Sequence, residues 1–312
     1  MSMSKIERVR AAVAGTDVDR PPFSVWYHFG LQHASAERTA EVHLEFFEAY
    51  NLDWLKVMND YSYPMPRAIE TLSDARDLKR LIAFDVRQGS LGEQLETIRL
   101  IGQSLRGKAL VVDTIFNAWN TLKRNVLKEA MGPLMEEHPA ELEAALAVVN
   151  DNLIRYAQAS LARGAAGIFF SVPATTESLT LEQYERFMRP FDLAFLQAIE
   201  GRGECHVLHA HGEHLYFDRL IDYPAQALSW ADLNGGPSIA EARRRTRFTL
   251  MAGLDHVKFV ESSARLVRGQ VARALAAGGA SGFMLAPGCS LPTYAYPPLI
   301  HAARDESSKP RA

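Results

Sequence analysis

Short apolar segments alternate with longer amphipathic segments along most of the chain. We predict eight short strands, because each segment is almost continuously apolar and is bounded by Gly, Pro, Asp or Asn. Such runs are typical of parallel strands that are covered on both faces. The predicted strands are Phe23–Phe29, Trp54–Asp60, Ala109–Phe116, Gly167–Val172, His206–Gly212, Ala227–Leu233, Thr249–Asp255 and Gly282–Gly288.

Apolar residues recur at helical spacing between most of these strands. The segments Thr39–Tyr50, Pro139–Arg163, Leu181–Ile199 and Ser262–Ala277 show this pattern. Strands that alternate with helices predict an α/β fold, here a (β/α)8 TIM barrel. The long connections after the second and third predicted strands predict extra helices there.

No shift in composition marks a second domain, so we expect a single barrel domain over residues 1–312. Within it, residues 1–20 form a helical lead-in and the polar residues 305–312 form a frayed tail.

Polar residues gather where the predicted strands end. They are His28 on the first strand, Asn59 and Asp60 on the second, Asn117 after the third, His209 and His211 on the fifth, Asp232 and Asn234 after the sixth, Asp255 and His256 after the seventh, and Cys289 on the eighth. Because a barrel carries its chemistry at the carboxyl ends of its strands, this pattern predicts a functional site at that end.

His209, His211 and Cys289 are the strongest candidates for chemistry. The alternation in Cys205–His211 places both histidines on one face of a strand. Two imidazoles and a thiolate can provide three ligands of a tetrahedral zinc ion and leave the fourth position open. The alternative is three buried polar residues that are satisfied by hydrogen bonds inside the barrel. Cys205 is better interpreted as a small buried hydrophobic residue.

Two acidic residues are candidate catalytic groups. Asp60 at a strand end could orient a metal-bound histidine, bind substrate or only cap the following turn. Glu177, just after the fourth strand, could be a fourth zinc ligand, a general acid or base, or a charge at a helix N-terminus.

The candidate substrate-binding residues are polar and aromatic groups near the first three strand ends. We select His28, Tyr27, Asn59 and Trp119. The aromatic residues Trp26, Tyr27, Tyr61, Tyr63, Phe116 and Trp119 could wall an apolar pocket that excludes water, or they could only pack in the core and rim.

Composition excludes several classes of protein. The net charge of −3 does not indicate a nucleic-acid surface, and no apolar run approaches the length of a membrane helix. The N-terminus lacks the apolar core of a signal peptide, and the two cysteines do not suggest a disulfide framework. We therefore expect a cytoplasmic protein with a small-molecule substrate.

The chain resembles the uroporphyrinogen decarboxylase superfamily, and within it the methylcobalamin:coenzyme M methyltransferase branch. The resemblance extends from about residue 6 to residue 303 and rests on the segments from Glu7 to Pro22, from Ser178 to Pro190 and, most specifically, from Gly278 to Pro292. In that branch a His-x-Cys pair and a cysteine in an Ala-Pro-Gly-Cys turn hold zinc. The resemblance therefore implies zinc on His209, His211 and Cys289.

The resemblance further implies transfer of a methyl group to a zinc-activated thiol, with methylcobalamin supplied by a separate corrinoid protein. The resemblance is also compatible with a homodimer.

The main departure from this branch is His211, which stands where the branch has a cysteine. Two imidazoles and one thiolate leave zinc more positive, so a bound thiolate becomes a weaker nucleophile. A zinc-dependent lyase or hydrolase on the same scaffold is therefore the alternative. A metal-free decarboxylase is a poorer match, because residues 27–33 contain no arginine to bind the substrate's carboxylates.

Overall fold

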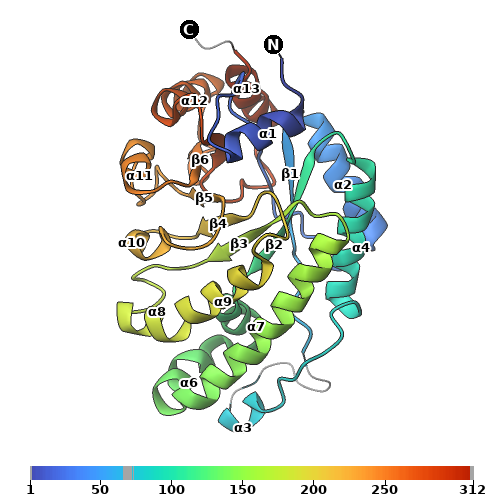
Figure 1. Cartoon of the computed structure of the whole chain (residues 1–312), viewed down its shortest axis with the longest axis vertical. Helices are drawn as coiled ribbons and strands as arrows, with labels where there is room; N and C mark the ends of the chain where they lie inside the picture. The colour runs from blue at the N-terminus through green and yellow to red at the C-terminus, as the bar shows by residue number, and fades with distance from the viewer. Residues whose placement is uncertain (1, 66–71, 73, 310–312) are drawn as a thin grey trace.

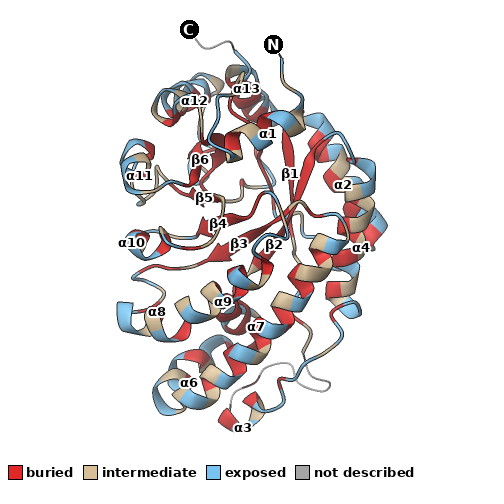
Figure 2. Ribbon diagram, in the orientation of Figure 1, coloured by how far each residue is buried: buried red, intermediate tan, exposed pale blue. Residues whose placement is uncertain are grey.

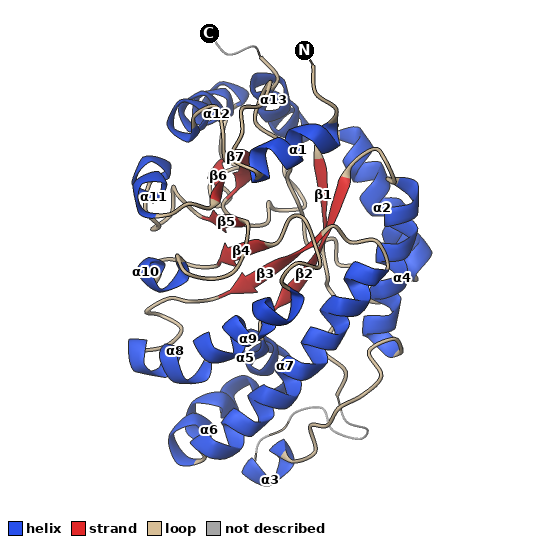
Figure 3. Ribbon diagram, viewed as in Figure 1, coloured by secondary structure: helices blue, strands red, loops and turns tan. Residues whose placement is uncertain are grey.

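Seven parallel strands form the centre of the structure, a computed structural model that describes residues 2–65, 72 and 74–309. The strands follow the chain in the order β1 to β7, and the sheet curls with helices around its outside (Figures 1 and 3). Their bounds are β1 Trp54–Val57, β2 Leu110–Phe116, β3 Gly167–Val172, β4 Val207–Ala210, β5 Ala227–Trp230, β6 Thr249–Leu254 and β7 Phe283–Pro287. A parallel α/β architecture is thereby confirmed.

The connections after β1 and β2 are the longest, and both contain helices. The first holds α3 (Ala75–Leu78) and α4 (Gly89–Ser104). The second holds α5 (Ala118–Thr121), the π-helical turn η1 (Leu122–Leu127), the 3₁₀ turn η2 (Lys128–Ala130), α6 (Met131–Glu137) and α7 (Pro139–Ala162). The other helices are α1 (Lys5–Val13), α2 (Ala36–Ala49), α8 (Leu181–Phe187), α9 (Arg189–Ile199), α10 (Phe217–Leu220), α11 (Ile239–Arg245), α12 (Ala264–Gly278) and α13 (Pro297–Ser307).

The first predicted strand, Phe23–Phe29, does not form a strand, so the described residues give seven strands rather than eight. Only Phe23 makes a bridge, a parallel one to Leu285 of β7. The N–H of Phe23 donates to the carboxylate of Asp53 instead of to a strand, and the hydroxyl of Ser24 donates to the carbonyl of Trp54. The segment thus lies between β1 and β7 without a regular ladder, because side chains take part in its hydrogen bonds.

An apolar layer covers each face of the sheet, and the strands are buried along their length (Figure 2). The larger layer lies between the sheet and the helices. The smaller one contains Trp26, Trp54, Phe169, Cys205 and Met251, together with Val9 and Ala12 of α1. Residues from alternating positions on several strands fill this second layer, as expected inside a barrel-like sheet. Burial in it raises the pKa of Cys205 to about 12, so this thiol behaves as a hydrophobic residue.

A buried ion cluster ties the two ends of the described chain together. The fully buried Asp53 carboxylate accepts hydrogen bonds from Arg8 of α1, from Arg20 and from Arg304 of α13. Helix α13 extends to Ser307, so the first three residues of the expected frayed tail are helical and that prediction was wrong for them. No helix in the described ranges combines the length and apolar character that a membrane crossing requires.

Candidate metal centre and cavity

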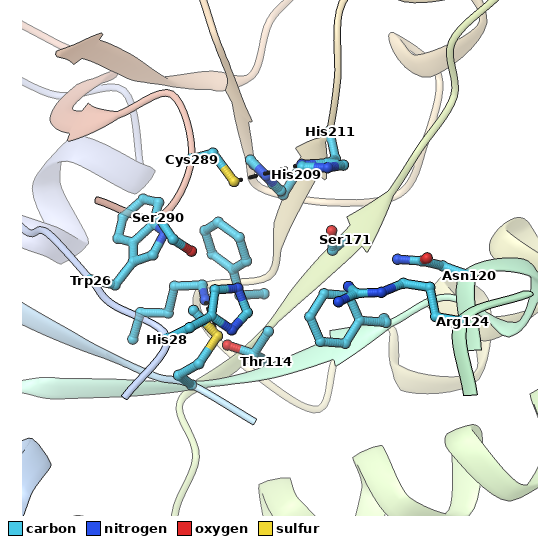
Figure 4. A pocket seen from close by; sticks show the side chains of 14 residues that line it. Trp26, His28, Thr114, Asn120, Arg124, Ser171, His209, His211, Cys289 and Ser290 are labelled. Carbon is cyan, nitrogen blue, oxygen red and sulfur yellow. Dashed lines mark hydrogen bonds between the residues drawn. The ribbon is translucent and has the colours of Figure 1, made fainter. Parts of the chain in front are cut away.

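A cavity opens at the carboxyl ends of the strands, and side chains from β1, β2, β3, β4 and the turn after β7 line it (Figure 4). It encloses about 400 Å³ of space that no atom fills, part of it open to solvent. Its volume on the scale used for ligand cavities is about 50 Å³, so only a small group fits within it. Among the residues that the structure describes, those lining it include no aspartate or glutamate, whereas lysine, arginine and histidine are all present.

His209, His211 and Cys289 come together at one wall of this cavity. One ligand atom from each residue lies within 4.8 Å of the other two. His209 is the last residue but one of β4, and His211 is the first residue after this strand. Cys289 is the second residue after β7. The strand alternation thus places both imidazoles on one side, as the sequence predicted.

Hydrogen bonds and close packing hold two of these residues in place. The Nδ1 atom of His209 lies 3.1 Å from the hydroxyl of Ser229 on the neighbouring strand, which leaves its Nε2 for another partner. Gly288 precedes the cysteine, and a Cβ atom at this position would meet the Cα of Ala231 at 2.6 Å. Only glycine therefore allows this turn to approach β5 so closely and bring Cys289 to the histidines.

The three groups alter one another's pKa values. Burial opposes ionisation of Cys289, but its hydrogen bonds with His209 and His211 outweigh burial and hold the pKa of this thiol well below its usual range. The hydrogen bond to Cys289, 3.6 Å between Sγ and Nδ1, raises the pKa of His211 against the effect of burial. Burial lowers the pKa of His209. A thiolate beside a neutral imidazole is a suitable set of donors for a metal ion.

His28 and Asp60 form a pair at the cavity entrance. Nδ1 of His28 lies 2.6 Å from Oδ1 of Asp60, and the N–H of Gly30 donates to Oδ2. Burial raises the pKa of Asp60, but the hydrogen bonds from His28 and Gly30 and the charges of His28 and Lys56 together outweigh burial, so the net shift of this pKa is downward. His28 lines the cavity directly, whereas Asp60 orients it from behind.

Tyr27 and Trp119, two of the predicted substrate-binding residues, are not among the residues that line this cavity. Trp26 and His28 point inward, so the residue between them points to the opposite side, where the Tyr27 ring packs against Phe46. Trp119 is buried in the layer between sheet and helices.

Asn59 and Glu177 also lie outside the cavity. Asn59 lines a separate small cavity beside Tyr61. Glu177 is exposed and pairs with His214, so the structure does not bring it to the three candidate ligands.

Several cavity residues were not predicted from the sequence. Lys56 is buried on β1, and Ser171 on β3 is paired in register with His209. Asn120 and Arg124 come from the α5–η1 segment after β2, and Arg124 lies on the π-helical turn. Of these residues only Lys56 could have been identified from the sequence, because a charged residue inside an apolar strand is unusual.

The curled parallel sheet, with a polar cavity and a candidate metal centre at the carboxyl ends of its strands, defines an α/β protein of the barrel type. Residues 55–306 match the family model described as uroporphyrinogen decarboxylase (URO-D). The chain belongs to the uroporphyrinogen decarboxylase family. A comparison with curated protein sequences found no match.

Solved structures share the fold at low sequence identity. A methyltransferase from Methanosarcina mazei is 17% identical with a TM-score of 0.81, and the match covers 98% of each chain. A B12-independent methionine synthase from Shewanella sp. W3-18-1 is 12% identical with a TM-score of 0.51 over 68% of this chain and 65% of the other. A putative vitamin-B12-independent methionine synthase from Listeria monocytogenes is 10% identical with a TM-score of 0.53, over 87% and 86%.

Proposed function

We propose that this protein is a zinc-dependent methyltransferase that moves a methyl group to the sulfur of a small thiol. The observation that carries the proposal is the cluster of His209, His211 and Cys289, whose ligand atoms lie within 4.8 Å of one another at the cavity wall. Its structural neighbours include proteins described as a methyltransferase and as methionine synthases. The family match and the fold point to an enzyme.

The donor set fits zinc. Two imidazole nitrogens and one thiolate sulfur are ordinary zinc ligands, and the hydroxyl of Ser229 holds His209 in one orientation. A zinc ion here would supply Lewis acidity, which lowers the pKa of a thiol placed in its fourth coordination position.

The remaining cavity residues bind the acceptor and exclude water. The rings of Trp26 and Phe169 are buried and wall the inner part of the cavity. The guanidinium of Arg124 has no ion-pair partner among the described residues and lies over the Phe116 ring, with 5.3 Å from Cζ to the centroid. An unpaired guanidinium in a cavity without acidic residues favours an acceptor that carries a negative charge. His28, oriented by Asp60, contacts the acceptor near the entrance.

The methyl donor is a corrinoid carried by a separate protein. A cavity whose volume is about 50 Å³ cannot enclose a corrinoid macrocycle, so the donor has to be presented from outside. Of the three residues of the candidate metal centre His211 is the exposed one, which favours approach of such a donor from its side.

The first test is the metal content of the purified protein, measured by elemental mass spectrometry. We expect about one zinc per chain in the natural protein and in Cys205→Ala, which removes the other cysteine from the apolar interior. Cys289→Ala should contain none. If neither the natural protein nor the control variant retains zinc, the proposal is wrong.

The second test is demethylation of methylcobalamin with small thiols as acceptors, using the zinc-loaded protein. A charged series of similar size, namely 3-mercaptopropionate, 2-mercaptoethanol and cysteamine, separates acceptors by charge. We expect the anionic thiol to be preferred and Arg124→Gln to remove that preference. Absence of turnover with every thiol, despite full zinc content, would contradict methyl transfer.

His211 favours a second candidate, a zinc-dependent lyase or hydrolase. With an imidazole in place of a second thiolate, the ligand set carries one negative charge fewer. A more positive zinc ion is better suited to activating water than to keeping a bound thiolate nucleophilic. Activity that requires zinc but no corrinoid would support this alternative.

A further inference from the structure

Lys56 is a buried amine that faces the same cavity as the candidate metal centre. It lies on β1 with an exposed fraction of 3%, and its Nζ lies 4.6 Å from the centroid of the Phe169 ring and 5.4 Å from that of Trp26. Among the described residues its one hydrogen-bond partner is the sulfur of Met58, a weak acceptor at 3.4 Å. It makes no hydrogen bond with the three candidate zinc ligands in the described structure.

No carboxylate compensates this amine. Among the residues that the structure describes, Lys56 has no ion pair. The two carboxylates that act on it electrostatically are already engaged, Asp60 by His28 and Asp113 by Tyr156, Gln94 and Ser160. A buried charge without a partner is costly, so a lysine with only a structural role would be an unfavourable choice among aromatic rings.

The surroundings of Lys56 favour its neutral form. Burial lowers its pKa to about 7, while the charges of Cys289, Asp60 and Asp113 act in the opposite direction. The other charged or titratable residues lining the cavity are Arg124, His28, His209 and His211. Near neutral pH a substantial fraction of Lys56 is therefore a free amine, which can accept a proton.

We propose that Lys56 accepts the proton that the acceptor thiol loses when it binds in the cavity. This inference rests on the proposed methyl transfer and names the proton acceptor for it. The S–H bond breaks, its electron pair stays on sulfur, and the proton forms an N–H bond with Nζ, so that thiol and amine become thiolate and ammonium. The rings of Trp26 and Phe169 stabilise the ammonium through cation–π interactions. After methyl transfer the neutral thioether leaves and the ammonium releases its proton to solvent.

The other groups in the cavity are less suited to this role. The described part of its lining contains no carboxylate, and His209 and His211 are assigned to the metal. His28 is the remaining base, but it is already paired with Asp60 and lies at the exposed entrance. The choice between Lys56 and His28 can therefore be tested directly.

The experiment counts protons during binding of 3-mercaptopropionate to the zinc-loaded protein. Calorimetric titrations at about pH 8, in buffers with different ionisation enthalpies, give the number of protons released to the buffer. With Lys56 as acceptor, the natural protein and the surface control Lys108→Met should release almost none, and Lys56→Met should release about one per thiol. Release of one proton by both the natural protein and Lys56→Met would overturn the proposal. The proposal would also be overturned if His28→Gln, and not Lys56→Met, released one proton per thiol to the buffer.

A second measurement uses the unsubstituted protein, so its result does not depend on whether a variant folds. In protein labelled with ¹⁵N at the lysine side chains, the Lys56 nitrogen should move from an amine to an ammonium frequency when the thiol saturates the site. An amine signal that stays unchanged would overturn the assignment of Lys56. If no thiol binds to the zinc-loaded protein, as followed by the charge-transfer band of a cobalt-substituted sample, then methyl transfer to a thiol itself is wrong and the inference falls with it.

Discussion

Replacement of Lys56 by methionine should stabilise the zinc-free protein at neutral pH. Methionine has a similar length and no charge, and the site consists of Met58, Trp26 and Phe169. Burial lowers the pKa of Lys56 from its ordinary value of 10.5 to about 7 in the folded protein. Between these values the unfolded chain binds a proton that the folded chain does not, so the free energy of unfolding rises with pH across this range.

The size of the effect follows from that difference in pKa. Linkage gives a penalty for the lysine of ~4 kcal/mol at pH 7, which falls to ~2 kcal/mol at pH 9. The lost cation–π contacts offset about 1 kcal/mol of the gain. We therefore expect Lys56→Met to be more stable by roughly 3 kcal/mol at pH 7, with a difference that narrows as the pH rises.

Urea unfolding between about pH 6 and pH 9 measures this difference. Lys108→Met serves as the matched control, because Lys108 is exposed and its replacement should change stability little. If Lys56→Met is less stable than the natural protein at pH 7, or if the difference does not change with pH, then the amine is not held neutral by burial and the reasoning fails.

Three further predictions concern the supports of the site and the fold. Ser229→Ala should weaken zinc binding roughly 10-fold, because His209 loses the hydrogen bond that orients its ring. Competition with a chelator measures the zinc affinity, and an unchanged affinity would exclude this orienting role of Ser229. Gly288→Ala should lower zinc content while the protein stays folded, because the new Cβ collides with Ala231 and displaces the cysteine that follows; full zinc occupancy would contradict this. Asp53→Asn should cost roughly 3–5 kcal/mol in urea unfolding, because Arg20 and Arg304 lose the carboxylate they pair with, while Arg8 keeps Asp19. A loss below about 1 kcal/mol would show that solvent compensates these two guanidinium groups.

Hydrophobic patterning was sufficient to predict most of the sheet. The second to eighth predicted strands correspond to β1 to β7, and Gly167–Val172 has the same bounds in both. Apolar runs bounded by turn residues are a local property of a strand buried on both faces, so the sequence shows them directly. The segment Phe23–Phe29 has the same pattern but lacks a ladder, since its first N–H donates to the Asp53 carboxylate, a residue distant in the sequence. A pattern of side chains cannot show which partner takes a backbone hydrogen bond.

The three candidate ligands could be identified from the sequence, because strand alternation places His209 and His211 on one face and the turn residues place Cys289 at a strand end. Which other side chains join them in the cavity depends on the three-dimensional packing. It turns Trp26 inward and Tyr27 outward, and it brings Lys56 and Arg124 into one cavity although they lie far apart in the chain. Facing direction and distance depend on how the sheet curls and how the α5–η1 segment folds over it. These properties come from packing between remote segments, and no local pattern of residues encodes them.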